Sequence, residues 1–97
     1  MSSWTYSPKA KADLKAIWTY SAHSWGPDQA DRYIRQIDET CKALAVGRLK
    51  GLDVTYIRPG YFKQRIGSHL IFFTRPSPSE IVIIRLLHQS MDIDRQI

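Results

Sequence analysis

Three short apolar runs in the second half of the chain, residues 61–66, 69–75 and 80–88, form its clearest pattern of hydrophobic positions. Each run is rich in β-branched and aromatic residues, and turn-forming residues separate them at 67–68 and 76–79. Runs of this length and composition are typical of strands. The pattern therefore predicts three consecutive antiparallel strands joined by tight turns.

Both faces of these strands are expected to be apolar, because successive side chains point to opposite faces. In the second run His69, Ile71 and Phe73 oppose Leu70 and Phe72. The third run alternates in the same way, with Ile81, Ile83, Arg85 and Leu87 opposite Val82, Ile84, Leu86 and His88. A chain this short does not offer two obvious covering layers, so we expect either a curled sheet or, preferably, a partner that covers one face.

The first half of the chain predicts a short edge strand followed by two helices. Residues 4–6 alternate like a strand, and Ser7 with Pro8 makes a strong helix start, because Ser7 can cap and Pro8 suits the first helical position. Apolar residues then recur at helical spacing on either side of Gly26-Pro27. The first stripe is Leu14, Ile17, Trp18, Ala22 and Trp25, and the second is Ala30, Tyr33, Ile34, Ile37, Cys41, Leu44 and Ala45. We expect the aromatic residues of both helices, and Cys41, to lie in the core.

The order of these elements predicts a single α+β domain over residues 1–97. A two-helix hairpin packs on a small, mainly antiparallel sheet in the order β-α-α-β-β-β. Residues 47–60 lose the periodicity, and Arg58-Pro59-Gly60 is typical of a type II turn. Residues 89–97 are expected to form at most one helical turn and a mobile tail.

Composition and charge narrow the functional classes. The content of 43% hydrophobic residues argues against disorder, and neither a membrane span nor a signal peptide is found, so we expect a cytoplasmic protein. One cysteine and three scattered histidines predict no metal site, and no cofactor is expected.

The positive charge of the chain is unevenly distributed. Residues 1–41 hold five basic and five acidic residues, whereas residues 42–97 hold nine basic and four acidic. The basic second half predicts an acidic partner.

Short motifs are spaced along nearly the whole chain. They are Tyr6-Ser7-Pro8, Ala12-Asp13-Leu14, Ile17-Trp18, Trp25-Gly26, Arg58-Pro59-Gly60-Tyr61, Gly67-Ser68-His69, Ile71-Phe72-Phe73, the segment from Arg85 to Gln89, and Met91-Asp92. With the order of elements, these motifs resemble the ParE toxins of the RelE/ParE superfamily. The resemblance implies a ParD-type antitoxin that wraps the toxin, and a free toxin that poisons DNA gyrase by binding rather than by catalysis.

The resemblance and the charge pattern together suggest two sets of contact residues. The antitoxin is expected to contact Arg65, Arg75, Arg85 and Phe73. The target, gyrase, is expected to contact His88, Met91, Ile93 and Arg95, at and beyond the end of the last strand.

The main alternative is ribosome-dependent mRNA cleavage of the RelE type. This reaction needs a base, an acid and cations near the phosphate, for which His88, Arg85 and Arg65 are the candidates. However, His69 stands where ribonuclease members of the superfamily carry a strand arginine, and the preceding loop offers Asp53 but no glutamate. No convincing base is therefore present, and we favour binding over cleavage.

Plainer roles are also open for these side chains. His88 can bond to the backbone at the strand end, His69 can serve the turn, and Arg85 can pair with a carboxylate of this chain. A basic nucleic-acid-binding domain is a third alternative, with Tyr56 and Tyr61 to stack on bases. It is disfavoured because no recognition helix stands out.

Overall fold

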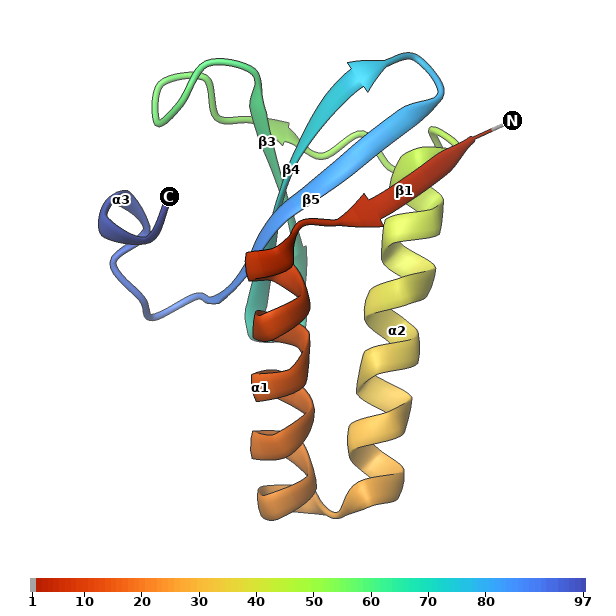
Figure 1. Cartoon of the computed structure of the whole chain (residues 1–97), viewed down its shortest axis with the longest axis vertical. Helices are drawn as coiled ribbons and strands as arrows, with labels where there is room; N and C mark the ends of the chain where they lie inside the picture. The colour runs from red at the N-terminus through yellow and green to blue at the C-terminus, as the bar shows by residue number, and fades with distance from the viewer. Residues whose placement is uncertain (1) are drawn as a thin grey trace.

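The computed structural model describes residues 2–97, apart from the side chain of Asp94, and shows a five-stranded sheet with two long helices on one face (Figure 1). The elements are β1 (Ser3–Tyr6), α1 (Pro8–Trp25), α2 (Pro27–Ala45), β2 (Leu52–Asp53), β3 (Tyr61–Ile66), β4 (His69–Ser77), β5 (Glu80–His88) and α3 (Ile93–Gln96). The strand order is β1-β5-β4-β3-β2, and β1 pairs in parallel with β5 while the other pairs are antiparallel. The α+β prediction is confirmed, and β2 is a short strand that the sequence pattern did not reveal.

The start of α1 and the turn before β3 form as predicted. The Ser7 Oγ accepts a hydrogen bond from the Ala10 amide at 3.1 Å, and Pro8 takes the first helical position. In the turn, the Tyr61 amide donates to the Arg58 carbonyl at 3.1 Å, and Gly60 has a φ of 78°. A positive φ at this position is what a type II turn requires, and glycine adopts it without strain.

The larger core lies between the helices and the sheet. The predicted stripe of α2 is confirmed: five of its members are buried, namely Ala30, Ile37, Cys41, Leu44 and Ala45. Ile71, Phe73, Ile81 and Ile83 meet them from β4 and β5. Burial raises the pKa of the Cys41 thiol to about 11, so this side chain stays protonated near neutral pH and packs as a small apolar group.

The aromatic residues of α1 are not in the core, and this part of the sequence prediction is wrong. Trp18, Tyr20 and Trp25 are 38%, 71% and 73% exposed. The end of α1 and the start of α2 extend past the end of the sheet, so no strand lies opposite these turns (Figure 1). Trp18 instead donates from its Nε1 to the Asp31 carboxylate at 2.8 Å.

The alternation predicted for β5 is interrupted. Phe72 pairs with Arg85 but Phe73 pairs with Ile83, so the register shifts and Ile84 has no direct partner on β4. Beyond this bulge Leu86, rather than Arg85, joins the helix-facing core. The Ile84 carbonyl accepts a hydrogen bond from the Ser7 hydroxyl at 2.7 Å. The residue that precedes α1 therefore supplies a hydrogen-bond partner for the backbone at the bulge.

The chain itself covers the second face of the sheet, contrary to the expectation that a partner or a curl was needed. Val54, Phe72 and Leu87 are buried there. The partly buried residues that pack against them come from the loop before β3, from β3 and β4, and from the C-terminal end: Ile57, Tyr61, Leu70, Ile93 and Ile97. A loop and a tail thus serve as the second layer.

The C-terminal segment is attached to the sheet, so the prediction of a mobile tail is wrong. Arg58 donates from Nη2 to the Ile97 carbonyl at 2.7 Å, and Arg85 donates from Nη1 to the Gln96 carbonyl at 2.9 Å. Together with the packing of Ile93 and Ile97, these bonds hold α3 against the second face. Within the part of the chain that the structure describes, no helix is long and apolar enough to cross a bilayer.

Candidate functional site

Asp13 and Arg85 form an ion pair between α1 and β5. The Arg85 Nε lies 2.7 Å from the Asp13 Oδ2 and its Nη2 lies 3.0 Å from Oδ1, with both side chains 16% exposed. The Leu86 amide also donates to Asp13 at 3.0 Å. These hydrogen bonds raise the pKa of Arg85. Since Nη1 binds the Gln96 carbonyl, every guanidinium nitrogen has a partner within the chain.

A polar cluster of Tyr33, His69 and His88 lies where β4 begins and β5 ends, with Tyr33 contributed by α2. The Tyr33 hydroxyl is 3.1 Å from the Ile66 carbonyl and 2.7 Å from the His69 Nδ1. The carbonyl can only accept, so Tyr33 donates to it and His69 donates its Nδ1–H to the Tyr33 oxygen. A Cβ at Gly67 would lie 2.7 Å from this hydroxyl, and glycine is required for the close approach.

His88 has the opposite tautomer. Its Nδ1 accepts a hydrogen bond from the Ser90 amide at 3.1 Å and lies 2.7 Å from the Ser90 hydroxyl. A neutral His88 therefore carries its proton on Nε2, whereas His69 has a lone pair on Nε2. The two rings meet edge to face with centroids 5.4 Å apart. The plainer role of His88 is confirmed, because its Nδ1 accepts from the backbone after its strand. The His69 side chain bonds to Tyr33 rather than to the turn.

The His69 environment predicts a pH dependence of stability. Burial is the main reason that the pKa of His69 is lowered from 6.5; the nearby His88 lowers it further and Asp13 opposes the shift. The unfolded chain therefore binds the proton first as pH falls through about 6.5, and the free energy of unfolding is expected to decrease below that pH. Denaturant titrations of the wild type and of His69→Gln between pH 5 and pH 8 check this. An equal acid loss in both proteins would contradict it.

The antitoxin residues predicted from the sequence do not converge on one patch. Arg65 is exposed and donates to the Gly67 carbonyl at 3.1 Å, near the beginning of β4. Arg75, near the other end of β4, donates to the Leu44 carbonyl at 2.8 Å, where α2 ends. Phe73 is fully buried, so its assignment to an exposed binding surface is wrong. Its ring stacks on Phe62 with centroids 5.5 Å apart. Both side chains lie on the side of the sheet that the helices cover.

The predicted target residues lie close together but differ in exposure. Met91 is 47% exposed, and the Arg95 side chain is also exposed, with only a long contact of 3.8 Å to Asp92. His88 is tied to Ser90, and Ile93 packs on the second face of the sheet. Met91 and Arg95 are therefore the members of this set that a partner can reach without disturbing the fold.

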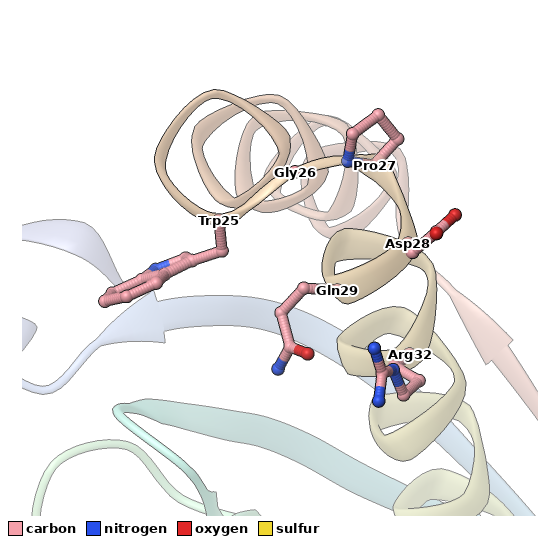
Figure 2. Close-up of a pocket in the computed structure, with 6 residues that line it drawn as sticks. All are labelled: Trp25, Gly26, Pro27, Asp28, Gln29 and Arg32. Atoms are coloured by element: carbon pink, nitrogen blue, oxygen red, sulfur yellow. The ribbon is translucent and has the colours of Figure 1, made fainter.

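The tip of the helical hairpin exposes Trp25, which sequence reasoning assigned to the core. A hollow of about 530 Å³ is lined by Trp25, Gly26, Pro27, Asp28, Gln29 and Arg32. Figure 2 shows Trp25, Gln29 and Arg32 on one side of the turn, with Asp28 pointing away from them. Among the described residues, no group of three His, Cys, Asp or Glu side chains could hold a metal ion.

Comparison with known proteins assigns the chain to a family. Residues 5–93 match the family described as the ParE toxin of the type II toxin-antitoxin system, parDE. Toxin ParE1 of Mycobacterium tuberculosis is 38% identical over 96 residues, covering 99% of this chain and 98% of that protein. Toxin ParE1 of Caulobacter vibrioides is 39% identical over 92 residues, covering 95% and 94% respectively.

A solved structure supports the same assignment. The chain superposes with a TM-score of 0.74 and 27% identity on a structure described as the chromosomal ParDE toxin-antitoxin system from P. aeruginosa, covering 91% of this chain and 96% of that one. The sequence resemblance and the fold therefore agree over nearly the full length. This chain belongs to the ParE toxins of the type II parDE toxin-antitoxin systems.

Proposed function

We propose that this toxin is neutralised by a ParD-type antitoxin and that, when free in the cytoplasm, it inhibits DNA gyrase by binding to it. The antitoxin assignment is supported by the similarity to a solved structure described as a ParDE toxin-antitoxin system. The gyrase assignment rests on the ParE resemblance of the motifs. The basic character of the chain, with a formal net charge of +5, suits an acidic antitoxin.

The state of Arg85 is the observation that most supports binding over RNA cleavage. Phosphate chemistry needs a cation that is free to meet the developing negative charge. The three guanidinium nitrogens of Arg85 instead donate hydrogen bonds to Asp13 and to the Gln96 carbonyl. His69 donates to Tyr33, and His88 accepts from Ser90, so both Nδ1 atoms are also engaged. The ribonuclease candidates thus have structural partners in this fold.

Two surfaces follow from the proposal. Arg65 and Arg75 remain the predicted antitoxin contacts, since both are charged and lie outside the core. Met91 and Arg95, the exposed members of the C-terminal set, are the predicted target contacts.

The purified chain is expected to inhibit supercoiling, or to trap cleaved DNA, in a reaction that contains only gyrase, DNA and ATP. Ribosome-bound message should stay intact under matched conditions, because Arg85, His69 and His88 are engaged by partners within the chain. The control is the same toxin premixed with the antitoxin encoded beside it, which should restore supercoiling. Cleavage of message without an effect on gyrase would reverse the assignment.

A further inference from the structure

The loop between β2 and β3, residues 54–60, is held in place by its own backbone. The Val54 amide donates to the Tyr61 carbonyl at 2.9 Å. The Val54 carbonyl accepts from the amides of Ile57 at 2.8 Å and Arg58 at 3.1 Å. The Val54 side chain is 1% exposed and belongs to the smaller core on the second face of the sheet. A loop fixed in this way presents its outward side chains with little ordering cost when a partner binds.

Tyr56 projects from this loop into solvent. It is 79% exposed, the highest value among the exposed large hydrophobic residues that the structure describes. A single exposed apolar residue is common on protein surfaces, so its surroundings decide what it signifies. A tyrosine that is both exposed and held on an ordered loop has the properties of an interface anchor, because its large ring loses little freedom on binding.

The surroundings of Tyr56 connect it to the C-terminal segment. Ile57, the next residue, packs against the same buried cluster as Ile93 and Ile97. Arg58 donates from Nη2 to the Ile97 carbonyl at 2.7 Å. The loop and α3 therefore form one continuous surface over the second face of the sheet, and this surface includes the predicted target contacts of the C-terminal segment.

The charges around Tyr56 favour a protein partner over a nucleic acid. Asp53 accepts hydrogen bonds from the hydroxyl of Thr55 and from its amide at 2.7 Å, and these bonds lower the pKa of the Asp53 carboxyl group. The carboxylate therefore stays negative beside the loop, and Asp92 adds an exposed acid on the C-terminal segment. Both acids would repel phosphates. Tyrosine, methionine and arginine among charges of both signs are instead typical of a protein interface.

We propose that the gyrase surface contacted by Met91 and Arg95 also receives the ring of Tyr56, so that the loop 54–60 and α3 form a single target-binding surface. The proposal rests on the proposed function and extends the target surface from the C-terminal segment to the loop. The ring of Tyr56 fills an apolar pocket on the target, and carboxylates of the target meet Arg95.

The test compares two tyrosines of similar exposure on different layers of the fold. Tyr56→Ala removes the proposed anchor, and Tyr20→Ala removes the same side chain from α1, where it is 71% exposed. The measurement is gyrase supercoiling as a function of toxin concentration. Tyr56→Ala should raise the concentration for half inhibition at least about tenfold, whereas Tyr20→Ala should change it by less than about threefold.

Thermal scans and antitoxin binding show whether the Tyr56→Ala chain is intact. Because the side chain is so exposed, Tm should change by no more than about 2 °C. The Kd of the antitoxin encoded beside the toxin should change by less than about threefold, since the antitoxin is expected to contact other residues.

Full gyrase inhibition by Tyr56→Ala, an equal loss in Tyr20→Ala, or a loss of antitoxin binding in Tyr56→Ala would overturn the inference and leave the proposed function intact. A wild-type chain without effect on gyrase would overturn both. Binding of a single-stranded oligonucleotide by the wild type that Tyr56→Ala abolishes would assign the loop to nucleic acid and also refute the inference.

Discussion

Replacing Asp13 by asparagine is expected to lower the free energy of unfolding by about 3 kcal/mol, because the partly buried Arg85 charge loses its counterion. The neutral amide keeps the size of the side chain but retains only one acceptor oxygen for Arg85 and the Leu86 amide. Such a loss corresponds to a fall in Tm of more than about 10 °C for a domain of this size. Denaturant unfolding and thermal scans measure both quantities.

The matched control is Glu39→Gln, which removes one carboxylate charge from an exposed position of α2. Its stability should stay within about 0.5 kcal/mol of the wild type. If Asp13→Asn were as harmless as this control, the ion pair would not contribute to the fold. Arg85 would then be available for a partner, and the argument against phosphate chemistry would lose its main support.

The double variant Met91→Ala with Arg95→Ala is expected to reduce gyrase inhibition at least about tenfold, equivalent to about 1.4 kcal/mol of target affinity. Both side chains are exposed and neither belongs to a core, so Tm should change by no more than a degree or two. Gyrase supercoiling assays and thermal scans of the same samples measure the two effects. Full inhibition by the double variant would remove the C-terminal segment from the target contact.

Truncation after Gln89 should behave differently from that double variant. It removes Ile93 and Ile97 from the second face of the sheet and is expected to cost about 2 kcal/mol of stability, roughly 1 kcal/mol for each partly buried side chain. It therefore confounds loss of folding with loss of target contact, and the point substitutions separate them. A truncated chain with unchanged Tm would show that α3 adds nothing to the fold.

The sequence predicts the elements well because local rules decide them. Ser7, Pro8 and the Gly26-Pro27 junction are helix-boundary signals that do not depend on distant residues. The strands predicted at 61–66, 69–75 and 80–88 follow from composition and turn residues, although β4 continues to Ser77. The two-residue β2 gives no comparable pattern, since Leu52 and Asp53 gain strand geometry only by pairing with β3.

Errors arise where distant segments decide the outcome. The exposure of Trp25 depends on where the sheet ends, which helical periodicity does not encode. The bulge at Ile84 changes which β5 residues face the helices, so simple alternation assigned Leu86 and Leu87 to the wrong faces. Among the candidate site residues, the exposure of Arg65 and Arg95 could be predicted from their charge. Phe73 is buried because it lies on the face of the sheet that the helices cover.

The adjacency of β1 and β5 has a consequence for synthesis of the toxin. The first strand of the chain pairs with the last, from Ser3 opposite Glu80 to Tyr6 opposite Ile83. The ion pair of Asp13 likewise needs Arg85, which is made late in synthesis. A growing chain cannot complete either contact until β5 has left the ribosome, because domains with such distant pairings assemble late. Any premature stop ahead of β5 leaves α1 without its main partner on the sheet. Incomplete translation products are therefore expected to be harmless to the cell that makes them.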